Sequence, residues 1–316
     1  GLWLVTRLDP LGGPGAEVEV VIPSGASAGE IGSILEDAGV VVSSSAFGLY
    51  VRVKGIDDLE AGTYRLRRDS AVEDVVRDLR DGPEAAYTRL VLPEGLTLDE
   101  IAERVDGLPG LAGDRFLELA RSGVVRSRYL PEGSRTLEGM LFPDTYHVAA
   151  GEDEEGLLRR MVERFDQVAE EVGLDDAEAA VGLSPYEAVV VASMVETEAK
   201  LAKERPLVAA VVFNRLEIGM RLQIDATVLY ALGRHKTGIT SKDLTVDSPY
   251  NTYRVMGLPP TPIASPGEAS LRAALHPAEV DYLYYVLIDP SGVHGFTASA
   301  GEFERLKADS KRRGVF

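Results

Sequence analysis

SPYEAVVVASMVETEAKLAKERP, residues 184–206, decides how the second half of the chain is interpreted. Its opening predicts a helix start, because Ser184 suits the cap, the following Pro suits the first helical position and Glu187 completes a capping box. The next eight residues, AVVVASMV, are apolar or small on every side, which is typical of a buried helix. Two carboxylates, Glu196 and Glu198, stand at the end of this helix. Burying a carboxylate is costly unless it is paired, neutral or used in chemistry.

The two glutamates face different surroundings on the predicted helix. Glu196 lies on a stripe of small or apolar residues: Val189, Ala192, Ser193 and Ala199. A carboxyl there is open to a ligand but poorly solvated, which keeps a proton available near neutral pH and suits a general acid. Both glutamates are instead structural if they form ion pairs with the basic side chains that follow: Lys200, Lys203 or Arg205.

A repeated pattern precedes this helix. VIPSGASAGEI (21–31) and VLPEGLTLDEI (91–101) each predict a strand, a Pro-Gly turn and a helix opened by a capping box. The two copies also end in similar segments, LEAGTYRL (59–66) and LEGMLFPDTYHV (137–148). We therefore expect an α+β fold in four parts: a linker next to a membrane (1–16), a first module (17–83), a related second module (84–150) and a mixed α/β catalytic domain around the buried helix (151–316).

Composition and charge narrow the class of protein. The 316 residues are 45% hydrophobic and 27% charged, as in ordinary globular proteins. The net charge of −18, from 51 acidic and 33 basic residues, argues against nucleic acid as a partner. The chain has no cysteine and its four histidines are scattered, so we expect neither a metal site nor a cofactor.

The first residues, GLWLV (1–5), are apolar although no stretch is long enough to span a membrane. They are consistent with the end of a missing N-terminal membrane helix whose Trp3 lies at the interface. An arbitrary chain boundary explains the same residues nearly as well.

The stretch RLQIDATVLYALG (221–233) alternates polar and apolar residues. Alternation with a period of two places every second side chain on one face of an extended segment. An amide, a carboxylate and a hydroxyl on this face suit hydrogen bonding to sugar substituents. The candidate residues are Gln223, Asp225 and Thr227. A solvated surface explains the pattern equally well.

A second polar stretch follows at DSPYNTY (247–253). Ser248 and Asn251 favour turns, while Tyr250 either stacks on a sugar ring or fills a core. Two tyrosines among Ser, Asn and Thr favour the wall of a groove, so we predict these three residues to bind substrate. Asn214, at the end of a predicted helix over 206–216, is a candidate for orienting the Glu196 carboxyl.

Seven segments in one order carry a family resemblance: ASMVETEAK, ERPLVAAVVFNRLEIGMRLQIDATVLYALG, DSPYNTY, GLPPTPIASPG, AALHP, YLYYV and GVHGF. Together they closely resemble the endolytic murein transglycosylases, the MltG or YceG-like family, over the chain from about Glu17 to the last helix. VIPSG and LEAGTY are similar to the LysM-like N-terminal portion of that family.

This resemblance implies a specific function. Members have one N-terminal membrane helix and an enzyme outside the cytoplasmic membrane, and they act without a cofactor alongside cell-wall synthases. They cut nascent peptidoglycan strands internally, between N-acetylmuramic acid and N-acetylglucosamine, and leave 1,6-anhydro ends. The family's catalytic glutamate falls on Glu196, which leaves Glu198 as a structural residue.

Two other functions stay open at this point. The chain is a peptidoglycan-binding scaffold if its modules bind glycan and Glu196 is inert. It is a hydrolytic muramidase if a second carboxylate lies across the sugar from the acid, for which Asp225 and Asp247 are the candidates. Shortening of purified glycan separates the scaffold from the enzymes.

Overall fold

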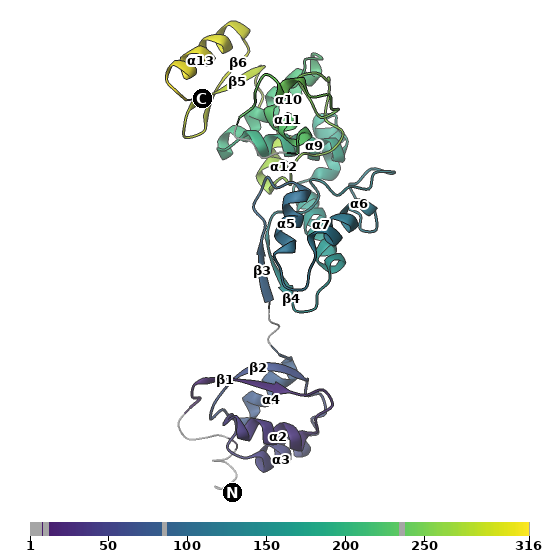
Figure 1. Ribbon diagram of the computed structural model, residues 1–316, viewed down its shortest axis with the longest axis vertical. Coiled ribbons are helices and arrows are strands. Elements are labelled where there is room, and N and C mark those ends of the chain that lie inside the picture. The colour runs from purple at the N-terminus through teal and green to yellow at the C-terminus, as the bar shows by residue number, and fades with distance from the viewer. Residues whose placement is uncertain (1–7, 9–12, 84–86, 234–237, 316) are drawn as a thin grey trace. The chain divides into compact units, whose positions relative to one another are not determined.

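The computed structural model describes residues 8, 13–83, 87–233 and 238–315. The chain forms two compact units, Gly1–Ala86 and Tyr87–Phe316 (Figure 1). The apolar residues 1–5, interpreted above as the end of a membrane helix, lie outside the described residues, as do residues 84–86 at the predicted start of the second module.

The first unit is a strand–helix–helix–strand module followed by one helix. Its elements are β1 (Glu17–Ile22), α2 (Ala28–Asp37), α3 (Ser44–Lys54), β2 (Gly62–Arg67) and α4 (Val72–Asp81). β1 pairs antiparallel with β2, and the helices bury Leu35, Phe47 and Leu79. The predicted capping box of Ser27 and Glu30 is present.

The second unit begins with the same order of elements. They are β3 (Tyr87–Val91), α5 (Leu98–Asp106), α6 (Gly113–Ser122) and β4 (Thr145–Ala149), and β3 pairs antiparallel with β4. Thr97 and Glu100 form the predicted capping box at the start of α5. The repeat in the sequence is therefore a repeat in structure. The LysM-like character of the modules stays a prediction.

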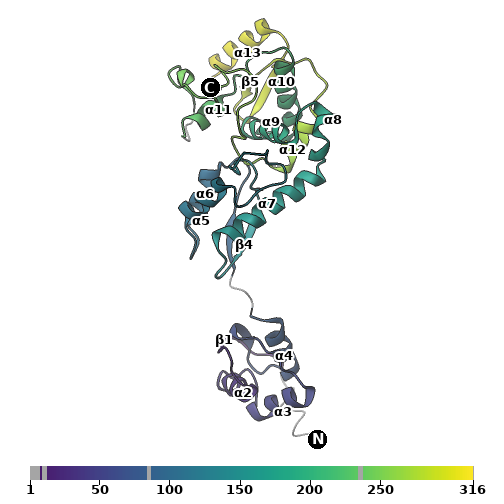
Figure 2. The same cartoon turned by 90° about the vertical axis from the view of Figure 1, so that its right-hand side faces the viewer.

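The predicted core helix is α9 (Pro185–Glu198), and it is buried as expected. Every residue from 188 to 195 is buried, and the capping box of Ser184 and Glu187 opens the helix. Around it pack α10 (Arg205–Glu217) and α12 (Glu268–Leu275), and α8 (Ala177–Val181) precedes it. The long helix α7 (Glu154–Glu171) runs beside this group in Figure 2 and buries its predicted apolar face.

The chain ends in a hairpin covered by a helix. β5 (Tyr284–Asp289) and β6 (Val293–Thr297) pair antiparallel, and α13 (Ala300–Arg312) packs against both strands (Figure 2). Short 3-10 turns lie at Leu174–Asp176, Ala202–Glu204 and Asp243–Thr245. The predicted α+β class is confirmed, with small antiparallel sheets.

One local prediction is wrong. The alternating stretch 221–233 is not extended, because α11 (Asp225–Ala231) begins within it. Residues two apart on a helix point about 200° apart, so Asp225 and Thr227 do not share a face. Asp225 is exposed, whereas Thr227 is fully buried, with its hydroxyl bonded to the Ile224 carbonyl and to Thr252.

The second module and the segment after it share one hydrophobic core. The buried cluster runs from Leu90 of β3 through Phe116 and Met140 to α7, α9 and Leu275 of α12. The domain boundary predicted at residue 151 stays a prediction. In the structure, the second module lies within the same unit as the candidate acid.

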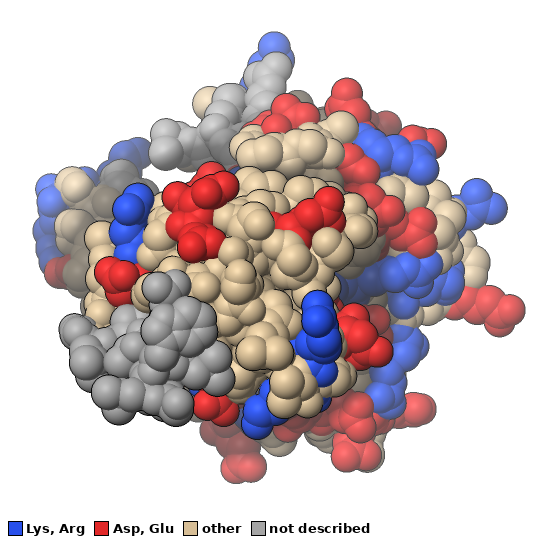
Figure 3. Space-filling model, turned by 90° about the horizontal axis from the view of Figure 1, so that it is seen from below, with Lys and Arg blue, Asp and Glu red and all other residues tan. Residues whose placement is uncertain are grey.

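No single helix among the described residues is long and apolar enough to cross a membrane, although Leu174–Val181 and Pro185–Glu198, bent by 89°, pass the length and composition test together. On the face drawn in Figure 3, acidic and basic side chains are interspersed with one another and with uncharged ones. The described part of that face thus carries mixed charge, unlike the basic stripe typical of proteins that track a phosphate backbone.

Candidate active site

Glu196 lies in the last turn of α9, where the buried part of the helix ends. Its side chain is only 5% exposed. One carboxylate oxygen accepts a hydrogen bond from Arg205 Nη2 at 3.1 Å, and the other accepts one from the Gly267 backbone N–H at 3.0 Å. The ion pair with Arg205 is the alternative that the sequence left open, and the structure contains it for this glutamate.

Two segments, the starts of α10 and α12, hold this carboxylate in place. Arg205 is the first residue of α10, is 12% exposed and donates from Nε to the Ser270 hydroxyl at 3.0 Å. Gly267 is the N-cap of α12, so its N–H belongs to a helix N-terminus, where the dipole favours negative charge. Both donors to Glu196 are held in place, because Gly267 is buried and Arg205 is bonded to the buried Ser270.

A second carboxyl, Glu94, reaches the same arginine from the Pro-Glu-Gly turn between β3 and α5. Glu94 Oε2 lies 3.5 Å from Arg205 Nη2, and the side chain is 47% exposed. Burial raises the pKa of Glu94, and the charge of Glu196 raises it further, against the opposing effect of Arg205. Glu94 is not among the residues predicted from the sequence, although the repeat offers a signal: the first module has Ser24 at the matching position.

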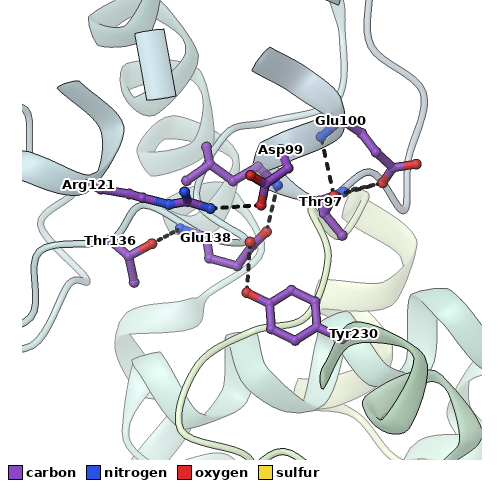
Figure 4. A network of polar contacts seen from close by, with 8 residues as sticks. Thr97, Asp99, Glu100, Arg121, Thr136, Glu138 and Tyr230 are labelled. Carbon is purple, nitrogen blue, oxygen red and sulfur yellow. Dashed lines mark hydrogen bonds and ion pairs between the residues drawn. The ribbon is translucent and has the colours of Figure 1, made fainter. Parts of the chain in front are cut away.

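A third carboxyl, Glu138, is buried and joins the start of α5 to α11 (Figure 4). It is 2% exposed and accepts from the Leu98 N–H and from the Tyr230 hydroxyl, both at 2.9 Å. Burial raises its pKa to about 7. Since Leu98 opens α5 and Tyr230 lies in α11, Glu138 ties the second module to the segment that carries the predicted substrate residues.

Glu198 has different hydrogen-bond partners from those of Glu196. It accepts from the Tyr285 hydroxyl of β5 at 3.0 Å and from the Ala226 backbone N–H. Burial raises its pKa. These contacts join the end of α9 to the hairpin and to α11, which is the arrangement of a structural residue.

The structure divides the predicted substrate residues into two groups. Asn214 and Asn251 donate their side-chain amides to backbone carbonyls, Asn214 to Val280 and Tyr282 at 2.9 Å each, while Thr227 is bonded internally as described above. In the described structure Asn214 makes no hydrogen bond to Glu196, and its two amide bonds hold the chain that leads into β5. Gln223 and Asp225 are exposed, and Ser248 and Tyr250 are partly buried.

The second group is held by local contacts, and its role in binding substrate stays a prediction. Gln223 adopts φ +50°, a left-handed conformation that is costly for a residue with a side chain and that often marks functional sites. Asp225 accepts from the Tyr253 hydroxyl. Tyr250 packs on Tyr230 with ring centroids 4.8 Å apart and shares a hydrogen bond with Thr261.

The described residues include no group of three or more acidic or histidine side chains arranged to hold a metal ion. What they offer is a group of side chains suited to acid–base chemistry: a buried carboxyl, a more exposed carboxyl and an arginine that contacts both. The fold and the site thus define an α+β protein with a duplicated module and a carboxylate site at the end of its core helix.

The chain belongs to the YceG-like family, whose model matches residues 20–309. It is 33% identical over 304 residues to the "Endolytic murein transglycosylase" of Bacillus subtilis (strain 168), covering 92% of this chain and 84% of that protein. The protein of the same name from Streptococcus pneumoniae serotype 2 (strain D39) is 32% identical over 310 residues, covering 85% of this chain and 54% of that one.

A solved structure also matches. The putative yceG-like protein lmo1499 from Listeria monocytogenes superposes with a TM-score of 0.63 at 35% sequence identity, covering 92% of this chain and 99% of that one. The predicted family is therefore confirmed by sequence and by fold.

Proposed function

We propose that this protein is a lytic transglycosylase that cuts peptidoglycan glycan strands internally between N-acetylmuramic acid and N-acetylglucosamine. Its relatives named endolytic murein transglycosylases supply the substrate class. The observation that carries the proposal is the position of Glu196, a 5% exposed carboxyl in the last turn of the core helix with fixed donors on both oxygens.

The chemistry follows from one carboxyl used twice. In its protonated form, Glu196 donates to the glycosidic oxygen as the bond from C1 to that oxygen breaks. The resulting carboxylate, stabilised by Arg205 and the Gly267 N–H, then takes the proton of the muramoyl C6 hydroxyl as that oxygen bonds to C1. Gln223, Asp225, Ser248 and Tyr250 are our candidates for holding the sugar substituents; Asn214, Thr227 and Asn251 act through the backbone they support.

A hydrolytic muramidase is the second candidate, because Glu94 is a further carboxyl beside the acid. Glycosidases that use two carboxyls place them on opposite sides of the sugar, about 5–5.5 Å apart for retention or about 6.5–9.5 Å for inversion. Glu94 and Glu196 instead contact the same nitrogen of Arg205, so they lie side by side. This arrangement favours a shared role in proton transfer and the substrate's own hydroxyl as nucleophile.

The first prediction tests Glu196 against its neighbour. Glu196→Gln keeps the shape of the side chain but has no proton to donate, so we expect cleavage of purified glycan to fall by about 10²–10⁴-fold. Glu198→Gln is the matched control on the same helix, and we expect it to stay within a few-fold of the parent. Both variants are assayed for glycan shortening and for binding. The reverse order of the two activities contradicts the assignment, and no shortening by any variant favours the binding scaffold.

We also propose that the protein acts outside the cytoplasmic membrane, held there by an N-terminal helix and close to cell-wall synthases. The support is the substrate named for its relatives, which is a wall polymer. Fractionation of cells that express the full-length gene product, with detection in the membrane fraction and protease access from outside, tests this location.

A further inference from the structure

We propose that Glu94 is the proton-holding partner of Glu196: the two carboxyls share one proton, Glu94 holds it when the site is empty, and Glu196 receives it before delivering it to the glycosidic oxygen. This inference rests on the proposed function. It concerns a residue of the second module, in the turn between β3 and α5.

The geometry brings the two carboxyls to one point from distant parts of the chain. Arg205 Nη2 lies 3.1 Å from Glu196 Oε1 and 3.5 Å from Glu94 Oε2. Gly267 lies against both, because its N–H donates to Glu196 and a Cβ added to it would fall 1.8 Å from Glu94 Oε1. The Glu196 carboxyl also lies close enough to Glu94 to raise its pKa.

The surroundings of the pair differ in a way that places the proton on Glu94. Glu196 accepts a charge-assisted bond and a bond from a helix N-terminus, and both stabilise its negative charge. Glu94 has only the longer contact to the same guanidinium, and its pKa is raised by burial and by Glu196. Two carboxyls this close disfavour each other's ionisation, so the pair keeps a proton to a higher pH than a lone glutamate would.

The internal repeat shows that the turn does not need this carboxyl to fold. The first module makes the same turn with Ser24 where the second has Glu94, and both turns lead into a capping box. Both glycines of these turns, Gly25 and Gly95, adopt a positive φ near +80°. The carboxyl at residue 94 is therefore an addition to a turn that folds without it.

The proton transfer balances within the pair. The O–H bond of Glu94 breaks as an O–H bond forms on Glu196, and Glu94 becomes the carboxylate that faces Arg205. Glu196 then passes the proton to the leaving oxygen. When Glu196 takes the C6 hydroxyl proton and returns it to Glu94, the pair is restored, so no external acid or base is consumed.

The test measures where the proton resides without substrate. Difference infrared spectroscopy follows the carbonyl stretch of protonated carboxyls in the parent, Glu94→Gln, Glu94→Ser and Glu196→Gln across the ordinary glutamate pKa of 4.5. Comparison between variants removes the signals of other carboxyls with raised pKa, such as Glu138 and Glu198. The groups that face Glu94 in the described structure are Glu196, Arg205 and the Gly267 backbone.

We expect a carboxyl that titrates above 4.5 in the parent and is missing from both Glu94 variants. In Glu196→Gln the same signal should move to lower pH, because the neighbouring negative charge is gone. The proposal is overturned if the signal survives in the Glu94 variants and disappears in Glu196→Gln, or if Glu94 titrates at its ordinary value.

Cleavage adds a second readout. Glu94→Gln and Glu94→Ser should lower glycan cleavage near neutral pH by about 10²-fold, with partial recovery at lower pH, where Glu196 takes a proton from solvent. Glu268→Gln removes an exposed carboxylate next to Gly267 that pairs with Arg272, and should leave the profile unchanged. If the pKa of Glu94 is raised but the protein cleaves no glycan, the proposed function is rejected and the shared proton stands. If the Glu94 variants cleave glycan with an unchanged pH profile, only the inference about Glu94 is rejected.

Discussion

The contacts of the Glu196 carboxylate show how this chain offsets the free-energy cost of burying a charge. A charge withdrawn from water is tolerated when it is paired and its lone pairs are bonded. Arg205 supplies the opposite charge, and the Gly267 N–H satisfies the other oxygen. Because Arg205 is itself fixed by Ser270, the carboxylate is held in one orientation, as a group that must meet a particular oxygen requires.

Glu138 gives a prediction about pH and stability. Its pKa is raised to about 7 in the folded protein from 4.5, so between these values the folded state binds more protons than the unfolded state. This group therefore stabilises less as pH rises through that window, by up to roughly 3 kcal/mol. We expect Glu138→Gln to gain stability relative to the parent on going from about pH 4.5 to above pH 7.

Chemical denaturation of the parent and Glu138→Gln at several pH values checks this expectation. Glu100→Gln, a carboxyl change in the nearby capping box of α5, serves as the control for a nonspecific charge effect. A constant difference between Glu138→Gln and the parent across that pH range contradicts the raised pKa.

The sequence predicted single residues well where the cause is local. The capping boxes of Ser27, Thr97 and Ser184 are present, because each depends on residues three positions apart. Glu94 was missed because its partners, Glu196 and Arg205, are about a hundred residues away, and periodicity carries no information about such contacts. Thr227 was misplaced because the left-handed Gln223 and the start of α11 break the alternation.

At the scale of elements, the N-terminus of α12 is where the site is assembled. Gly267 combines two requirements: its N–H must reach Glu196, and the space above its Cα must admit the Glu94 carboxyl. Its φ of −80° is ordinary, so it is not the backbone conformation that calls for glycine here. Glycine is needed here because the Glu94 carboxyl approaches so closely.

Gly267→Ala is therefore expected to affect the site more than the fold. The new Cβ meets the end of a flexible side chain, so Glu94 moves away and stability changes by about 1 kcal/mol or less. We expect cleavage to fall by a similar factor to Glu94→Gln. Thermal unfolding and glycan cleavage measured together check this, with Gly301→Ala, where a Cβ meets only ordinary contacts, as the control. Full activity of Gly267→Ala contradicts the role given to Glu94.

At the scale of the molecule, the second module is part of the unit that carries the site. It contributes Glu94, Glu138 and a large share of the hydrophobic cluster that encloses α9. The sequence showed that two modules are related but not that one of them packs into the catalytic segment, because both present the same local pattern. The first module forms a separate compact unit.

Two shortened chains test this organisation. Residues 87–316 retain the whole second unit, so we expect them to unfold cooperatively and to cleave glycan, with weaker binding of long strands. Residues 152–316 lack β3, α5, α6 and β4 and would expose the apolar surface that those elements cover, so we expect them not to fold. Circular dichroism with thermal unfolding checks both. A cooperative, active 152–316 chain contradicts the account.

The chemical form of the new glycan ends tests the central claim most directly. If one carboxyl performs both proton transfers and the C6 hydroxyl attacks C1, no water enters the product. Mass spectrometry of a digest made in heavy-oxygen water should then show 1,6-anhydromuramoyl ends, lighter by one water and free of the label, with fragments of several disaccharides early in the reaction. Reducing muramic acid ends that carry heavy oxygen would contradict the transglycosylase and support the muramidase.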